Sequence, residues 1–288
     1  MTEADFPALY RAADAASNSA QSAFLRAQQL NFVLLVGGAV CALLEPTREL
    51  AIASAVYFLA SLVVYAYIQQ QDFQAIWYRA RALAESVKTA AWRLVMGAQP
   101  FDQEDEGVRL EAFRQLLSEL LRQNQGIGKH LVGEWSSADQ VTPALLDTMR
   151  AGFQVKKQVY LKHRIDDQRQ WYTTKSVSNE RSSRHFFALI CAAYGSAIVL
   201  LLVKIASPDL KYLPIEVFAV VATSLIAWKQ LKRFDELSSA YSLTAHELGV
   251  IKSRFSAVEG RGALAAFVSD AENAFSREHT QWAARRDH

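Results

Sequence analysis

Four apolar stretches come in two pairs, and a short polar loop joins the two members of each pair. They cover residues 30–44 and 50–68, then residues 186–203 and 213–228. A bilayer offers no partners to backbone N–H and C=O groups, so a spanning segment must satisfy its own, which a helix does. The pattern therefore predicts an all-α membrane protein with four transmembrane helices arranged as two hairpins.

The stretches are short, since crossing roughly 30 Å of hydrocarbon takes about 20 apolar residues. Residues 50–68 come closest, whereas the fourth stretch carries Glu216 near its start. Local thinning of the bilayer, or snorkelling of Arg26 and Lys229, shortens the path that must be covered. The alternative is a soluble bundle of four buried helices. It is disfavoured because such helices normally carry a charged stripe, which these lack.

Composition agrees with a chain that is half in lipid and half in water. Hydrophobic residues make up 51% of the chain, and the mean hydropathy is only +0.02. A net charge of +2 does not indicate nucleic-acid binding. The basic residues gather instead near the span ends, on the side of the two termini and of the chain centre. By the positive-inside rule, this predicts cytoplasmic N- and C-termini and places residues 45–49 and 204–212 outside.

The two halves of the chain look like copies of one unit. Overlaying them places Tyr78 on Tyr241, Ala82 on Ala245, Val87 on Val250 and Trp92 on Phe255. Matches that do not all share one helical face are not explained by amphipathicity alone, and they indicate a duplication. We expect a first unit at residues 1–100, a helical connector at 101–154, a second unit at 155–260 and a C-terminal helix or tail at 261–288.

The segments outside the spans read as long amphipathic helices that form a cytoplasmic helical bundle. Residues 73–95 repeat apolar side chains at three-to-four spacing and should continue straight out of the second span. Residues 110–121 carry a second such stripe. Thr142 and Pro143 suit the cap and first turn of another helix. A last helix should run unbroken from about Val155 into the third span.

That last helix carries a polar and aromatic seam at helical spacing. It consists of Tyr160, Arg164, Asp167, Gln168, Trp171 and Lys175. We expect Arg164 to pair with Asp167 or Gln168, and Lys175 to lie over the Trp171 ring. The seam is either a packing surface against another cytoplasmic helix or a site for a partner or ligand.

A conducting path needs polar side chains within the spans. Ser54 and Ser61 share a face of the second span, and Glu216 and Thr223 share a face of the fourth. These four are candidate pore-lining residues. The alternative for Glu216 is an interfacial carboxylate that a helix N-terminus favours. Small residues in the first and third spans predict close helix packing: Gly37, Gly38, Gly195 and Ser196.

No motif for catalysis stands out in the chain. The six histidines have no partner at metal-ligand spacing, and neither His-Glu-x-x-His nor Gly-x-Ser-x-Gly occurs. We therefore expect no enzyme activity, no catalytic residues, no metal and no cofactor.

Three segments carry a family resemblance. The run YLKHRIDDQRQWY (residues 160–172) leads into a hairpin and resembles the SLATT family, the SMODS- and SLOG-associating two-transmembrane effector domains. LYRAADAAS (9–17) and AESVKTAAWR (84–93) are similar to another branch of that family. Together the matches cover most of the chain as two SLATT-like units in tandem.

The resemblance implies an effector of a bacterial anti-phage conflict system in the inner membrane. Such a protein would oligomerise and form a pore or disrupt the membrane when a nucleotide second messenger signals infection. No nucleotide-generating or nucleotide-sensing domain is recognisable in the chain, so a separate protein or a cyclic oligonucleotide ligand would activate it. The alternative is a non-conducting membrane scaffold or receptor that anchors a cytoplasmic signalling partner.

Overall fold

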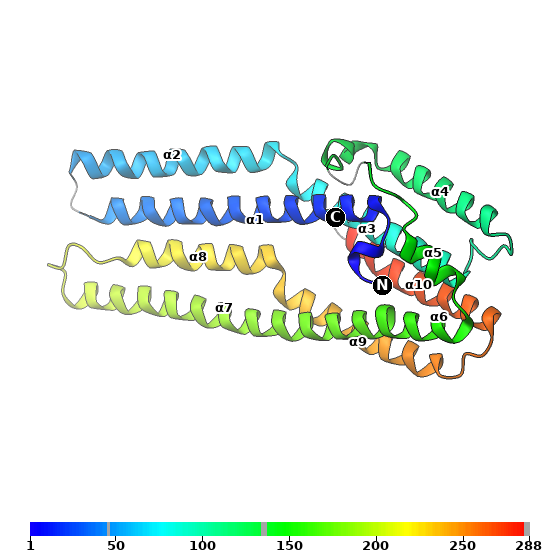
Figure 1. Ribbon diagram of the computed structural model, residues 1–288. Coiled ribbons are helices and arrows are strands. Elements are labelled where there is room, and N and C mark those ends of the chain that lie inside the picture. Colours follow the sequence, from blue (N-terminus) through cyan, green and yellow to red (C-terminus); the bar gives the residue numbers. More distant parts are fainter. Residues whose placement is uncertain (45–46, 134–136, 285–288) are drawn as a thin grey trace. The chain divides into compact units, whose positions relative to one another are not determined.

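The computed structural model describes residues 1–44, 47–133 and 137–284, and within them it contains helices and no strand. Figure 1 shows their course along the chain. The α-helices are α1 (Ala8–Leu43), α2 (Arg48–Gln70), α3 (Phe73–Met96), α4 (Glu106–Gln123), α5 (Pro143–Arg150), α6 (Phe153–Tyr160), α7 (Asp167–Ala206), α8 (Ile215–Lys232), α9 (Phe234–Phe255) and α10 (Arg261–Ala284). The prediction of an all-helical chain is confirmed.

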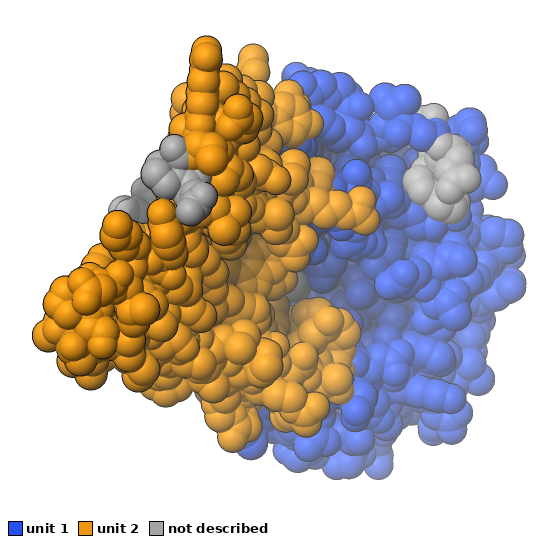
Figure 2. All heavy atoms as spheres, turned by 90° about the vertical axis from the view of Figure 1, so that its left-hand side faces the viewer, with its two compact units in different colours: residues 1–22, 73–170, 245–288 blue, residues 23–72, 171–244 orange. Residues whose placement is uncertain are grey.

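The helices form two compact units that are not continuous in sequence. Unit 1 contains residues 1–22, 73–170 and 245–288, and unit 2 contains residues 23–72 and 171–244 (Figure 2). The apolar stretches of both halves thus fall in unit 2, and the amphipathic segments of both halves fall in unit 1. Each structural unit draws on both halves of the sequence.

In unit 2, α1 and α2 form an antiparallel hairpin, which Figure 1 shows. The Ser61 hydroxyl donates to Asn31 Oδ1 at 2.6 Å, and the Ser54 hydroxyl donates to the Gly38 carbonyl at 3.0 Å. A Cβ added to Gly37 would lie 2.9 Å from the Tyr57 ring, which is too close. The prediction of close packing is therefore confirmed for the first hairpin.

The second hairpin packs α7 against α8 and the start of α9. Phe186 and Phe234 stack with ring centroids 5.4 Å apart. Farther along, the hydroxyls of Ser176 and Ser238 each donate to the other residue's carbonyl, at 2.8 and 3.1 Å. Gly195 does not serve close packing within the chain, because a Cβ there would meet no atom within 4 Å.

Three helical runs in the described residues are long and apolar enough to cross a membrane: Ala8–Leu43, Arg48–Met96 and Phe153–Ala206. The fourth expected span lies in α8, which is shorter and includes Glu216, Lys229 and Lys232. The arrangement of four spans as two hairpins therefore stays a prediction.

The amphipathic helices of unit 1 follow their expected patterns closely. On α3, the side chains of Ala80, Ala84, Val87, Ala91 and Leu94 are buried. On α5, the Thr142 hydroxyl accepts from the Leu145 N–H and Pro143 occupies the first turn. The last helix continues from α6 through a π-helical turn, Leu161–Asp166, into α7. The predicted long helix is therefore continuous, with one wide turn inside it.

One expectation about the stalk of the first hairpin is wrong. The helix does not run straight from the second span, because Asp72 adopts a left-handed conformation (φ 48°) between α2 and α3. Arg233, with φ 49°, makes the same break between α8 and α9. Short polar residues such as Asp tolerate this conformation, so periodicity alone did not reveal the bend. In the overlay of the two halves Asp72 falls on Asp235, so the two breaks lie two residues apart and not at the same position.

Candidate functional site

A charged residue lies in the middle of an apolar helix face in unit 1. The face of α10 that packs inward carries Leu264, Val268 and Phe275, all buried. Glu272 falls on the same face, and its exposed fraction is 0%. Burying an ionised carboxylate costs several kcal/mol unless it is paired and fully hydrogen-bonded. The partners of Glu272 therefore decide what this helix does.

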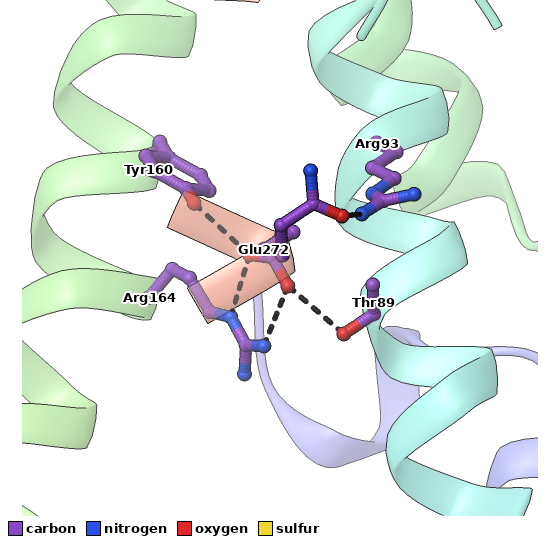
Figure 3. Close-up of polar contacts among 6 residues, drawn as sticks. Thr89, Arg93, Tyr160, Arg164 and Glu272 are labelled. Carbon is purple, nitrogen blue, oxygen red and sulfur yellow. Dashed lines mark hydrogen bonds and ion pairs between the residues drawn. The ribbon is translucent and has the colours of Figure 1, made fainter. Parts of the chain in front are cut away.

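Four donors surround the carboxylate, as Figure 3 shows. Arg164 donates from Nε to Oε1 at 2.8 Å and from Nη2 to Oε2 at 2.6 Å, so the ion pair is bidentate. The Tyr160 hydroxyl donates to Oε1 at 2.9 Å, and the Thr89 hydroxyl donates to Oε2 at 3.0 Å. Each carboxylate oxygen thus accepts two hydrogen bonds, which matches its two lone pairs. We call Thr89, Tyr160, Arg164 and Glu272 the Glu272 cluster.

The charged groups of the cluster are shielded from solvent and interact strongly with each other. Arg164 is only 1% exposed, and its guanidinium carbon lies 4.3 Å from the centre of the Phe275 ring. Burial lowers the pKa of Arg164, but the charge of Glu272 and the hydrogen bonds to it outweigh burial and raise the pKa. Burial, followed by the charge of Glu272, raises the pKa of Tyr160 well above its usual range. The arginine therefore stays charged and the phenol stays protonated.

The local backbone brings Tyr160 and Arg164 to one point. Tyr160 ends α6, and Arg164 lies in the π-helical turn that follows. Such wide turns are rare and frequently occur at functional sites. The Tyr160 ring also meets two buried aromatic rings, Trp92 at 5.6 Å and Phe255 at 6.1 Å between centroids. These are the two residues that the overlay of the halves places on each other.

A second contact ties α10 to α3 beside the cluster. Arg93 donates from Nη2 to Asn273 Oδ1 at 2.8 Å, and Asn273 directly follows Glu272 in the sequence; Figure 3 shows Arg93 on the same helix as Thr89. Lys88, one residue before Thr89, is half-buried, and burial lowers its pKa while the nearby charge of Glu85 opposes that shift. α10 is thus held against α3 by one buried carboxylate and by a more exposed amide.

The predicted seam is split by the structure. Arg164 does not pair with Asp167 or Gln168, because its side chain turns inward to Glu272. Asp167 is exposed and lies 3.7 Å from His163, while Gln168 is half-buried. The nearest carboxylate along the helix, Asp167, faces solvent, whereas the Glu272 carboxylate on the buried side accepts two hydrogen bonds from Arg164. Tyr160 and Arg164 belong to unit 1.

Asp167 and Gln168 also belong to unit 1, whereas Trp171 and Lys175 belong to unit 2 and lie beside aromatic rings. The Trp171 ring meets Tyr241 at 5.3 Å, and Lys175 Nζ lies 5.8 Å from the Trp171 centroid, as predicted. Tyr172 also contacts Tyr241, at 5.5 Å. This half therefore packs α7 against α9.

The four candidate pore-lining residues do not form one group. Ser54 and Ser61 of α2 are buried and bonded to α1. The Thr223 hydroxyl donates to the Ala219 carbonyl of its own helix at 2.9 Å, and Glu216 is exposed in the first turn of α8. The three hydroxyls are therefore satisfied within the chain.

Two family models match the chain in tandem. SMODS and SLOG-associating 2TM effector domain 3 matches residues 7–158, and SMODS and SLOG-associating 2TM effector domain 1 matches residues 160–282. The chain belongs to the SLATT family. No curated protein and no solved structure matches it. The boundary between the two SLATT domains falls just before Tyr160, so Thr89 comes from the first domain and the rest of the Glu272 cluster from the second.

Glu272 is the residue that sequence reasoning missed. Residues 261–288 were expected only as a helix or tail, and the seam was sought along one helix. The available signal was a carboxylate on the apolar stripe formed by Leu264, Val268 and Phe275. A charge in such a stripe predicts a buried partner of opposite sign elsewhere in the chain. Arg164 has the same signature, since Tyr160 and Ile165 beside it are buried.

Proposed function

We propose that this tandem SLATT protein is a bacterial inner-membrane effector whose two hairpins cross the bilayer with four spans and keep both termini in the cytoplasm. SLATT two-transmembrane domains are associated with anti-phage and other conflict systems. The proposed activity is a change in membrane permeability and involves no catalytic step.

The observation that carries the proposal is the apolar surface of unit 2. Large side chains on α2 and α7 face outward instead of into the chain: Ile52, Val56, Leu59, Leu62, Val63, Phe187, Ile198, Val199, Leu202 and Ile205. Soluble proteins rarely expose contiguous apolar patches above a few hundred Å², and larger ones mark contact with lipid or protein. A bilayer suits such a surface, because the exposed apolar side chains lie on both hairpins.

In our proposal the Glu272 cluster stabilises the inactive form of the protein by holding the stalks of the two hairpins together. α3 follows the first hairpin and the π-helical turn precedes the second, so the cluster joins the stalks of both hairpins within unit 1. Buried, fully bonded ion pairs have two discrete states, made or broken, which suits a switch. In our proposal a nucleotide-generating or nucleotide-sensing partner, or a cyclic oligonucleotide, releases the stalks. Several chains then assemble, because four helices enclose little lumen.

A second candidate function is a non-conducting membrane scaffold that anchors a cytoplasmic partner. The observation in its favour is that Ser54, Ser61 and Thr223 are all hydrogen-bonded within the chain. These three hydroxyls therefore offer no free hydrogen-bonding group to a passing ion within one chain, so conduction would depend on assembly.

A vesicle assay separates the two functions. The full chain is reconstituted into vesicles loaded with a self-quenched dye, and leakage is followed with and without cyclic dinucleotides and cyclic trinucleotides. An assembling effector gives leakage that rises more steeply than the protein-to-lipid ratio, and Glu216→Gln changes the ion preference of the leak. Reconstituted chains that never leak, with or without these nucleotides, would favour the scaffold.

A further inference from the structure

Two lysines lie at one end of the second hairpin, and each ammonium sits beside an indole ring. Lys175 of α7 places Nζ 5.8 Å from the Trp171 centroid. Lys232, the last residue of α8, places Nζ 6.0 Å from the Trp228 centroid. All four residues belong to unit 2.

The charge of Lys175 acts on Lys232, and no carboxylate among the described residues pairs with either ammonium group. Burial lowers the pKa of Lys232, and the charge of Lys175 lowers it further. Neither ammonium forms an ion pair with a carboxylate in the described part of the chain. Two neighbouring cations do: Lys229 pairs with Asp235 at 2.8 Å, and Arg233 pairs with Glu236. Holding two like charges together without a carboxylate is unfavourable unless an anion joins them.

The position of the pair indicates which kind of anion fits. Trp228 ends the fourth apolar stretch, and Lys232 follows it by one helical turn. Trp171, Tyr172 and Tyr241 form an aromatic cluster at the same end of the hairpin. Tryptophan and tyrosine concentrate at the level of lipid headgroups, and basic pockets between helices on the cytoplasmic side bind anionic headgroups.

The first hairpin has no equivalent site. At the corresponding end of α2 the sequence runs Gln69, Gln70, Gln71 and Asp72, which supplies no cation. The lysine pair is therefore a property of the second hairpin and not of every span end. A general attraction of basic residues to the membrane would not produce this asymmetry.

We propose that Lys175 and Lys232, flanked by Trp171 and Trp228, bind the phosphate of an anionic phospholipid headgroup. The inference rests on the proposed insertion of the hairpins in a membrane. Two ammonium groups supply up to six N–H donors to the phosphate oxygens, and the indole rings lie against the glycerol region. The bound headgroup supplies the counter-charge that neither ammonium group has among the described residues, since Asp235 and Glu236 pair with Lys229 and Arg233.

The test measures lipid preference at this end of the hairpin. The full chain is reconstituted into phosphatidylcholine vesicles that contain either brominated phosphatidylcholine or brominated phosphatidylglycerol, and quenching of tryptophan fluorescence is titrated. Lys175→Gln/Lys232→Gln should lower the preference for phosphatidylglycerol by about 5-fold per lysine, or about 25-fold in total. Lys204→Gln/Lys211→Gln is the matched control, because it removes two exposed lysines from the opposite end of the hairpin.

The outcomes separate the site from the proposed function. Equal quenching by both brominated lipids in the inserted wild-type chain would overturn the lipid site and leave membrane insertion standing. Failure of the chain to float with either vesicle would overturn insertion and the lipid site together. Loss of the preference on adding inorganic phosphate, but not chloride of equal ionic strength, would assign the site to soluble phosphate and overturn the lipid assignment. An equal loss in the control variant would also contradict the proposal.

Discussion

Replacing Glu272 by Gln removes one charge from the centre of unit 1 while keeping the side-chain shape. The amide retains one acceptor oxygen, which can take the place of Oε1 or of Oε2. Its NH₂ group then faces two donors, either Tyr160 and Arg164 Nε or Thr89 and Arg164 Nη2. Arg164, only 1% exposed, is left without a counter-charge.

The expected loss follows from that geometry. Breaking a fully buried ion pair by neutralising one partner costs about 3–5 kcal/mol, because the remaining charge stays desolvated. We therefore expect Glu272→Gln to lower the free energy of unfolding by about 3–5 kcal/mol. Replacing both members, as Arg164→Met/Glu272→Met, leaves no buried charge and should recover most of that loss.

The assay is guanidinium unfolding of the full chain in detergent micelles, followed by tryptophan fluorescence. Trp92 is fully buried against Tyr160 and reports the loosening of the cluster. Glu106→Gln is the matched control, since Glu106 also binds an arginine through both oxygens, Arg150 at 3.2 and 2.6 Å, but on the surface. We expect the control to leave the unfolding midpoint unchanged.

Two results would refute this reasoning. If Glu272→Gln and Glu106→Gln shift the midpoint equally, burial of the ion pair contributes nothing. If the double methionine variant is less stable than Glu272→Gln, the loss comes from disturbed packing and not from an uncompensated Arg164 charge.

Two further predictions test the surroundings of the cluster and the first hairpin. Burial, followed by the charges of Arg109 and Arg261, lowers the pKa of Lys156 to about 8. A lysine whose folded-state pKa lies below its unfolded value makes the folded state bind fewer protons, so stability rises with pH above about 8. Lys156→Met should flatten that rise in unfolding measured between about pH 8 and pH 10, and an unchanged slope would contradict the assigned pKa. In the first hairpin, Gly37→Leu should destabilise the chain by about 1–3 kcal/mol, since a Cβ there already lies 2.9 Å from the Tyr57 ring. Gly195→Leu, where a Cβ meets nothing within 4 Å, should leave thermal unfolding in detergent unchanged, and equal effects of the two changes would argue against the observed packing.

The helices of this protein were predictable because their periodicity is local. The buried face of α3 and the Thr142 cap follow from spacings of three or four residues within one segment. The bend at Asp72 was not predictable in the same way, since a single left-handed residue leaves the apolar pattern on both sides intact. The tandem duplication was predictable because finding it requires only a comparison of one half of the sequence with the other.

The Glu272 cluster was half predictable. Tyr160 and Arg164 were singled out from helical spacing, but their partner lies more than a hundred residues away along the chain. Local reasoning assigns Arg164 to the nearest carboxylate, Asp167, which the fold turns toward solvent. Long-range pairing depends on which faces the helices bury, and that is decided by packing in three dimensions.

The cluster also explains what a tandem arrangement adds to two separate hairpin domains. Trp92 and Phe255 occupy equivalent positions in the two repeats, and both meet the one ring of Tyr160. Glu272 accepts from Thr89 of the first SLATT domain and from Tyr160 and Arg164 of the second. The hydrogen bond to Thr89, like that between Arg93 and Asn273, therefore joins the two domains, whereas the bonds to Tyr160 and Arg164 lie within the second domain. Fusion in one chain gives the two hairpins a shared restraint that independent domains would obtain only by dimerising.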